Sequence, residues 1–344
     1  MLLSVFSGAG GLDLGFEKAG FDIGLAFDLR PDSIASYNAN RPGKAVGHVA
    51  DVRELDLAQL DAFYGDAFAP EGVIGGPPCQ SFSRANVVST SDDPRHDLPI
   101  TYANLILRIN DRSPISFFVF ENVTGLLSDK HIRKYELLKE TLRSEFDLHE
   151  ALLNSKDYNT PQRRVRIFLI GINRNKHPGA VWKRPIESTP FGTVLTVRSA
   201  IGGLPEPVQY RAGLDASQIP FHQNHWCMKP KSERFDGRLK PGDGRKRSFK
   251  TLAWDEPSIT VAYGNREVHV HPSCQRRLSV YEAMLLQGFP NNYKLLGSLS
   301  SQITQVSEAV PPPLAHAVAI SVRDALSPAI ASSSDAKPPS IRVG

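Results

Sequence analysis

Short apolar runs alternate with amphipathic patterns along the first half of the chain, and this alternation limits the folds that are open to it. The apolar runs predict strands at residues 2–6, 23–27, 72–74, 117–120 and 165–170. Helical patterns lie between them, for example at residues 12–19, 31–40, 98–110 and 131–146. Such alternation is typical of α/β proteins with a parallel sheet. We therefore expect a doubly wound, Rossmann-like α/β sheet.

The second half is organised differently. Residues 185–270 are rich in Pro, Gly, Asn and basic residues and show little periodicity, which predicts a smaller, loop-rich domain. A helix start returns with Ser279 as N-cap and Glu282 three residues later. We expect a main domain at 1–184 and 271–326, with a last helix near 313–326. Residues 327–344, rich in Ser, Pro and Ala, predict a disordered tail.

Charge is distributed unevenly. The net charge is only +4, but residues 156–277 carry 22 Lys and Arg against 10 Asp and Glu, whereas the remainder carries 18 against 26. A basic region beside an acidic remainder indicates a polyanionic partner, although random surface variation stays open as an alternative. The three cysteines give neither a disulfide framework nor zinc spacing. With no long apolar segment or signal peptide, this pattern predicts a cytoplasmic protein.

A glycine loop follows the first predicted strand. It reads Phe6-Ser7-Gly8-Ala9-Gly10-Gly11, and Asp28 ends the second strand 20 residues after Gly8. Glycines allow close approach of a ligand, and a carboxylate at this place can accept hydrogen bonds from ribose. Gly10 and Gly11 are adjacent, unlike G-x-G-x-x-G, and no Walker lysine follows. This favours a phosphate-free nucleoside such as S-adenosylmethionine over a pyrophosphate, while a simple tight turn remains the alternative.

Two later segments carry groups that can do chemistry. Cys79 follows Gly75-Gly76-Pro77-Pro78, a loop in which two prolines restrict the backbone and can hold a thiolate in place. The alternative is a buried cysteine that acts as a small hydrophobic residue. Glu121 ends the apolar run 116–120, where desolvation would raise its pKa and let it act as an acid. A glutamate that faces water or caps a helix is the alternative there.

An arginine-rich segment, residues 162–170, predicts a further strand. Period two places Arg164 and Arg166 on one face and Val165, Ile167 and Leu169 on the other. Two guanidinium groups on one face suit a phosphate or a carbonyl oxygen. A solvated edge strand is the alternative.

Taken in order, these motifs resemble those of the C5-cytosine-specific DNA methyltransferases of the bacterial restriction-modification type. The resemblance covers about residues 1–175 and 270–325. Its motifs are the glycine loop, Pro77-Pro78-Cys79-Gln80, Glu121-Asn122-Val123, Gln162-Arg163-Arg164-Val165-Arg166, the segment Arg276 to Glu282 (R-x-L-x-x-x-E) and the segment Gln305 to Pro311.

The resemblance implies the roles of individual residues. Catalytic roles would fall to Cys79, Glu121, Arg164 and Arg166, acting on a cytosine flipped out of duplex DNA. Residues that would bind S-adenosylmethionine, with no metal, are Phe6, Ser7, Gly8, Gly10, Gly11, Asp28, Leu29, Asp51, Val52, Pro78, Ser307 and Ala309. Residues that would contact DNA are Gln80, Ser83, Arg84, Arg95, Gln162, Lys246, Arg247 and Arg266. The resemblance further implies a monomer in the bacterial cytoplasm near the nucleoid, with a separate cognate restriction endonuclease as a partner.

The chain departs from the family pattern at Ser307-Glu308, where Gly-Asn is usual, which adds a carboxylate near the cofactor's methionine end. Asp28 replaces a more usual glutamate, and Leu29 stands where some members carry an aromatic residue. Two rival readings stay open, namely an RNA (tRNA) cytosine methyltransferase and a catalytically silent DNA-binding homologue. The basic insert favours duplex DNA, and intact Cys79, Glu121 and Arg166 favour an active enzyme.

Overall fold

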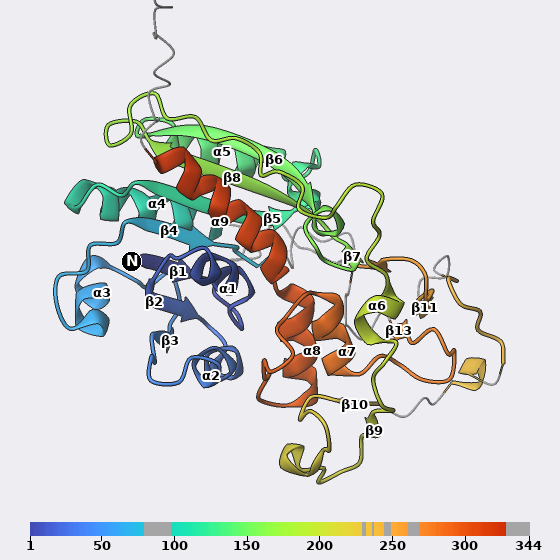
Figure 1. Ribbon diagram of the computed structural model, residues 1–344. Helices are drawn as coiled ribbons and strands as arrows, with labels where there is room; N and C mark the ends of the chain where they lie inside the picture. Colours follow the sequence, from blue (N-terminus) through green and yellow to red (C-terminus); the bar gives the residue numbers. More distant parts are fainter. Residues whose placement is uncertain (79–97, 229–231, 236, 244–248, 261–267, 328–344) are drawn as a thin grey trace, which may run out of the picture.

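The computed structural model describes residues 1–78, 98–228, 232–235, 237–243, 249–260 and 268–327. Its centre is a seven-stranded sheet in the order β3-β2-β1-β4-β5-β8-β6 (Figure 1). The strands are β1 Leu2–Val5, β2 Ile23–Asp28, β3 Gly47–Val49, β4 Gly72–Gly75, β5 Phe117–Val123, β6 Phe146–Asn154 and β8 Val165–Asn173. The first five are parallel, and β8 is antiparallel to both β5 and β6. The predicted α/β class is confirmed.

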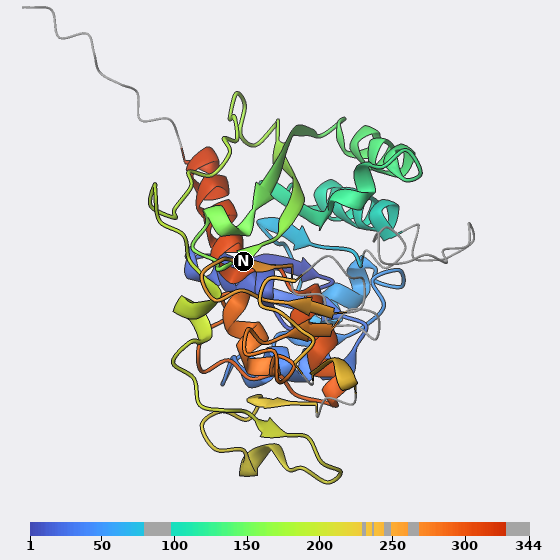
Figure 2. The same ribbon diagram turned by 90° about the vertical axis from the view of Figure 1, so that its right-hand side faces the viewer.

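Helices cover both faces of the sheet. One face packs against α3 Leu57–Tyr64, α4 Leu98–Arg112 and α5 Ile132–Leu142. The other packs against α1 Gly11–Lys18, α2 Pro31–Ala39 and α9 Pro312–Leu326. In Figure 2 the sheet lies between α9 on one side and the green α4 and α5 on the other. A sheet covered on both faces needs apolar side chains in both directions.

The strand β5 meets this requirement with an almost continuous apolar sequence. Phe117 and Val119 join the core beneath α1 and α9, whereas Phe118 and Phe120 join the core beneath α4 and α5. This period-two division follows from the pleat of the strand. It explains why the apolar run before Glu121 predicts a strand correctly.

A third core lies beyond the carboxyl ends of the parallel strands. It unites α6 Val197–Ile201, α7 Val280–Leu286 and α8 Leu299–Glu308 with apolar residues of the loop-rich segment between them. The short strands of this region and of the arginine segment form two-stranded sheets, namely β9 Val208–Gln209 with β10 Trp226–Cys227, β11 Phe249–Thr251 with β13 Val268–Val270, and β7 Gln162–Arg163 with β12 Ser258–Ile259. Figure 1 shows β9, β10, β11 and β13 on the side of α7 and α8, away from the large sheet, whereas β7 lies next to the start of β8.

Several element bounds differ from the prediction. The expected helix 131–146 ends at Leu142, and β6, which was not predicted, begins at Phe146. β6 is an edge strand with many half-exposed side chains, including charged ones, so its sequence lacks a strand-like apolar run. The helix start at Ser279 is confirmed, because Ser279 and Glu282 form a reciprocal capping box. The predicted tail lies outside the described residues after Ser327.

Among the residues described, no helix combines the length and apolar character needed to span a bilayer.

Candidate active site

The glycine loop joins β1 to α1 at the point where the order of the parallel strands reverses, between β1 and β4. Ligands of doubly wound sheets bind at such switch points. Gly10 is the N-cap of α1 and has a φ of 87°, in the left-handed region. A Cβ on Gly10 would also lie 2.9 Å from Tyr37 Cδ2 and from Arg41 Nη1, so this turn requires glycine.

Asp28 ends β2 and closes over the same loop. Its Oδ2 accepts a hydrogen bond from Gly8 N at 2.9 Å, and its Oδ1 accepts one from Arg30 N at 2.9 Å. Burial raises the pKa of the Asp28 carboxyl, while these two backbone donors oppose the rise. Each oxygen retains a second lone pair, so the carboxylate can still accept hydrogen bonds from a ligand.

Three further predicted residues line the same wall. Leu29 is 62% exposed and follows Asp28 directly, and Val52 is buried. Asp51 follows β3 and is paired with Arg53, whose hydrogen bonds lower the pKa of the Asp51 carboxyl. These positions form an apolar and acidic rim next to the glycine loop.

The opposite wall is built around Glu121, which is 7% exposed at the end of β5. Its Oε1 lies 3.1 Å from Arg166 Nε, an ion-pair contact without the alignment of a hydrogen bond. Burial raises the pKa of Glu121, and the charges of Arg166 and Arg164 oppose this rise. A Cβ on Gly76 would lie 2.8 Å from Glu121 Oε2, so a larger residue at this place would force the carboxylate or the Pro77-Pro78 loop to shift.

Arg164 lies in a break between β7 and β8, so the expected continuous strand 162–170 is wrong. Its side chain is 1% exposed and donates to two backbone carbonyls, Ser307 O at 2.9 Å and Glu308 O at 3.3 Å. The last four carbonyls of a helix have no partner within it, and a cation there also complements the helix dipole. Arg164 therefore holds the C-terminus of α8 against the site.

That C-terminus carries the last predicted motif. Ser307 and Ala309 both line the site, and Glu308 between them forms an ion pair with Arg30. Gln287 Nε2 donates to Val306 O, which satisfies another terminal carbonyl. The Ser307-Glu308 segment is thus fixed by donors from three separate parts of the chain.

All of these groups surround one cavity of about 350 Å³. Every described residue predicted to be catalytic or to bind the cofactor lines it, apart from Gly10. The volume and the mixed apolar and acidic lining suit a nucleoside with an attached amino acid, so the site fits S-adenosylmethionine. The described residues contain no group of three His, Cys, Asp or Glu side chains arranged to hold a metal ion.

Several predicted site residues lie outside the described part of the chain, and the structure gives no position for them. They are Cys79, Gln80, Ser83, Arg84, Arg95, Lys246, Arg247 and Arg266. Gln162 is described, but it is fully buried in β7, which pairs with β12, and it does not line the cavity.

Arg30 and Asp13 are among the cavity residues that the sequence did not indicate. Arg30 follows Asp28-Leu29, and no pattern indicated its partner 278 residues away. Asp13 lies in the first turn of α1, fully buried, and accepts hydrogen bonds from Ser4 Oγ at 2.9 Å and Tyr37 OH at 2.8 Å. Burial raises the pKa of Asp13 from 3.8 to about 6, although the charge of Arg41 opposes this. An acidic residue in the first turn of a helix was the available signal.

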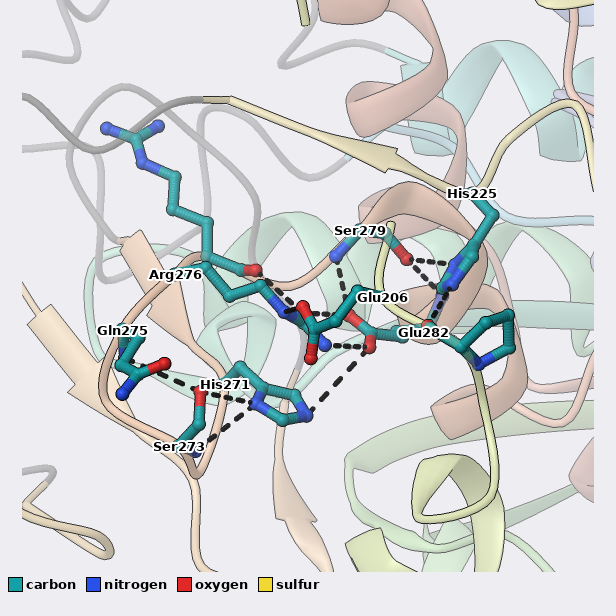
Figure 3. A network of polar contacts seen from close by, with 10 residues as sticks. Glu206, His225, His271, Ser273, Gln275, Arg276, Ser279 and Glu282 are labelled. Carbon is teal, nitrogen blue, oxygen red and sulfur yellow. Dashed lines mark hydrogen bonds and ion pairs between the residues drawn. The ribbon is translucent and has the colours of Figure 1, made fainter. Parts of the chain in front are cut away.

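A second polar network, outside the cavity lining, explains the R-x-L-x-x-x-E motif (Figure 3). Arg276 Nη1 and Nη2 each donate to a carboxylate oxygen of the fully buried Glu282 at 2.9 Å, and Arg276 Nε donates to Glu206 at 2.6 Å. Ser279 completes the capping box, and His225 Nδ1 lies 3.0 Å from its hydroxyl. The motif therefore fixes the start of α7 to the loop-rich segment.

Comparisons with known proteins agree with this geometry. The model of the family "C-5 cytosine-specific DNA methylase" matches residues 1–323. Type II methyltransferase M.MthTI of Methanothermobacter thermautotrophicus is 31% identical, over 94% of this chain and 96% of that protein. Type II methyltransferase M.NmeDI of Neisseria meningitidis serogroup C is 32% identical, over 95% of this chain and 84% of that protein.

Among solved structures, one from E. coli, assigned as a DNA modification methyltransferase encoded within a prophage, superposes with a TM-score of 0.76. It is 23% identical and covers 94% of this chain and 99% of its own, a likeness that concerns the fold. The class defined by fold and site is thus that of the Rossmann-like methyltransferases. The chain belongs to the C-5 cytosine-specific DNA methylase family, whose members are DNA (cytosine-5-)-methyltransferases that use S-adenosylmethionine. The predicted resemblance is confirmed.

Proposed function

We propose that this protein transfers a methyl group to C5 of a cytosine flipped out of a specific short duplex DNA sequence, through a covalent bond between Cys79 Sγ and C6 of the base. The observation that carries the proposal is the buried Glu121–Arg166 pair, which borders the same cavity as the glycine loop and touches the loop that leads to Cys79.

The cofactor's place follows from the cavity walls. Asp28 offers acceptors for ribose hydroxyls, Asp51 an acceptor for the adenine amino group, and Leu29 and Val52 apolar surface for the ring. Ser307 and Ala309 line the same site. When bound, S-adenosylmethionine supplies an electrophilic methyl group on a sulfonium sulfur.

The protein's own groups prepare the base. The Cys79 thiolate adds to C6, which breaks the ring conjugation and gives C5 the character of an enamine. Protonated Glu121 donates a hydrogen bond to N3, and Arg166 contacts O2, so the charge that develops on the ring is offset. With the cofactor bound, C5 would take the methyl carbon as its bond to the sulfonium sulfur breaks and the thioether product leaves; water would then remove the C5 proton, and the electrons of that C–H bond would expel the sulfur of Cys79. Arg164 acts as a positioning residue through the carbonyls of α8.

We propose that the loop-rich region 185–270 is a target-recognition domain, and that residues 1–184 and 271–326 form the catalytic domain. Its basic character suits phosphate contacts, for which Lys246 and Arg247 are candidates, and Arg266 is a candidate for a base edge. Gln80, Ser83, Arg84 and Arg95, after the nucleophile, would close over the flipped base. We further propose that the protein belongs to a restriction-modification system with a separate cognate endonuclease. It would work as a monomer at the nucleoid.

Methyl-labelled cofactor tests the substrate class directly. We expect label to enter duplex DNA and not tRNA, and bisulfite sequencing of DNA from expressing cells should place the modification at C5 of cytosine within one short sequence. Label that enters tRNA alone would overturn the DNA assignment and support the RNA rival.

A further inference from the structure

Arg30 and Glu308 face each other across the mouth of the cavity. Arg30 Nη1 contacts Glu308 Oε2, and Arg30 Nη2 donates to Glu308 Oε1 at 3.2 Å, so the contact is bidentate. Both residues line the cavity, and their side chains are 37% and 35% exposed. The pair therefore lies where the site opens to solvent.

Each partner is fixed to a different wall. Arg30 N donates to Asp28 Oδ1 at 2.9 Å, which ties Arg30 to the carboxylate that also accepts from Gly8 N. On the other wall, the carbonyl of Glu308 accepts a hydrogen bond from Arg164 Nη2 at 3.3 Å. An unbroken chain of polar contacts thus runs from the glycine loop through Arg30 and Glu308 to the arginine segment.

The pair also neutralises the charge of Glu308, which stands where the family usually has Asn. A lone carboxylate at this place would change the electrostatics of the cofactor site, but the guanidinium of Arg30 neutralises it within the pair. We propose that Arg30 and Glu308 are a positioning pair that holds the two walls at the separation the cofactor requires, an inference that rests on the proposed function. In this role they act through the pocket's shape and make no direct contact with the cofactor's amino-acid end.

Two ligands distinguish an effect on the shape of the pocket from a direct contact with the cofactor's amino-acid end. S-adenosylhomocysteine carries the amino-acid end, whereas 5′-methylthioadenosine lacks it. We expect Glu308→Gln and Arg30→Met each to weaken binding of both ligands, measured by calorimetry, by about three- to fivefold, the size expected of a partly exposed ion pair. The double variant R30E/E308R should bind both ligands within about twofold of the wild type.

The ion pair of Arg112 and Asp61 is a matched control. Arg112 Nη1 lies 2.9 Å from Asp61 Oδ2, and the side chains are 28% and 35% exposed. Neither residue lines the cavity. Asp61→Asn should leave both affinities unchanged. Melting temperatures recorded without ligand identify any variant that is unfolded. If a single variant is unfolded, R30E/E308R still tests the proposal, because it keeps both charges of the ion pair.

The possible outcomes are distinct. Unchanged affinities in both single variants, or no recovery in R30E/E308R, would overturn the proposal. Weakening of S-adenosylhomocysteine alone would also overturn it, because it would place the pair in direct contact with the amino-acid end. If the wild-type protein bound neither ligand, the proposed function would fail and the role of the pair would fall with it.

Discussion

Glu121 and Arg166 form a diagonal pair across the antiparallel strands β5 and β8. Arg166 lies opposite Val123 in the register, two residues beyond Glu121, and the side chains meet at 3.1 Å. Burial favours the protonated form of Glu121, and the guanidinium favours the ionised form; burial is the larger effect, so the pKa of Glu121 is raised. The sheet thus presents an acid and a cation side by side at the edge of the cavity.

Replacement of Glu121 by Gln should impair the chemical step alone. The amide keeps the size of the acid but cannot supply a proton, so we expect kcat to fall by about 100- to 1,000-fold. Cofactor affinity should stay within about twofold, since the pair lies beside and not within the nucleoside wall. Single-turnover kinetics and calorimetry measure the two quantities. A variant with full activity would remove Glu121 from the mechanism.

The pH dependence supplies a second readout for the same residue. Because the acid form is the active one, the wild-type rate should decline as the pH rises through the raised pKa of Glu121, above its ordinary value of 4.5. The Gln variant should lack this decline. If both proteins kept the same descending limb, another group would be responsible for it.

Gly76→Ala should displace the carboxylate of Glu121. The added Cβ would lie 2.8 Å from Glu121 Oε2, so either the carboxylate or the loop before Cys79 must move. We expect kcat to fall at least tenfold, since a misplacement of about 1 Å can lower a rate about 100-fold. Gly203→Ala, where a Cβ meets no atom within 4 Å, is the control and should keep wild-type activity. Equal activity in the two variants would contradict the close approach.

Arg164→Met should loosen the end of α8. The change removes two donors from Ser307 O and Glu308 O, and an unsatisfied buried carbonyl costs about 1–3 kcal/mol. We therefore expect a loss of about 2–4 kcal/mol in the free energy of unfolding, measured with urea, together with weaker cofactor binding. Arg174→Met is the control, because Arg174 is bound at the surface away from the cavity. An equally small loss in both variants would show that Arg164 does not hold the helix.

Asp13 gives a stability prediction with a definite sign. Its folded-state pKa of about 6 lies above the ordinary 3.8, so the folded protein binds a proton that the unfolded chain releases between these pH values. Stability of the wild type relative to Asp13→Asn should therefore rise as the pH falls through about 6, by about 2 kcal/mol between pH 7 and pH 4, with the rest of the effect appearing only below the unfolded pKa. Urea unfolding of both proteins at pH 7 and pH 4 measures this. A difference that does not vary with pH would contradict the buried, ionisable Asp13.

The residues that sequence alone located correctly are those fixed by local rules. Ser279 and Glu282 form the predicted capping box because such a box depends on four neighbouring residues. Asp28 and Glu121 lie at the ends of apolar strands, and parallel strands bring their ends together at one edge of the sheet. Period and spacing placed each carboxylate after an apolar run, and the resemblance to the methyltransferase family implied that the two share a site.

Long-range contacts account for what the sequence did not reveal. Arg164 leaves the strand because its guanidinium reaches carbonyls more than 140 residues away, and no local pattern encodes that partner. Arg30, the N-cap of α2, meets Glu308 at the end of α8 because α2 and α8 lie against each other. Gln162 lies in β7, which pairs with β12, a two-residue strand too short to have a periodic signature. Pairing between distant segments thus sets the details of the site.

The covalent bond to Cys79 is the central claim, and trapping tests it most directly. Duplex DNA that contains 5-fluorocytosine in the recognised sequence blocks loss of the group at C5, so the enzyme and the DNA should remain joined in the presence of S-adenosylmethionine. Mass spectrometry of the digested complex should locate the link on Cys79. Cys79→Ala should form no complex and transfer no methyl group, while it keeps its affinity for DNA. A link on another residue, or methyl transfer by Cys79→Ala at the wild-type rate, would contradict the account.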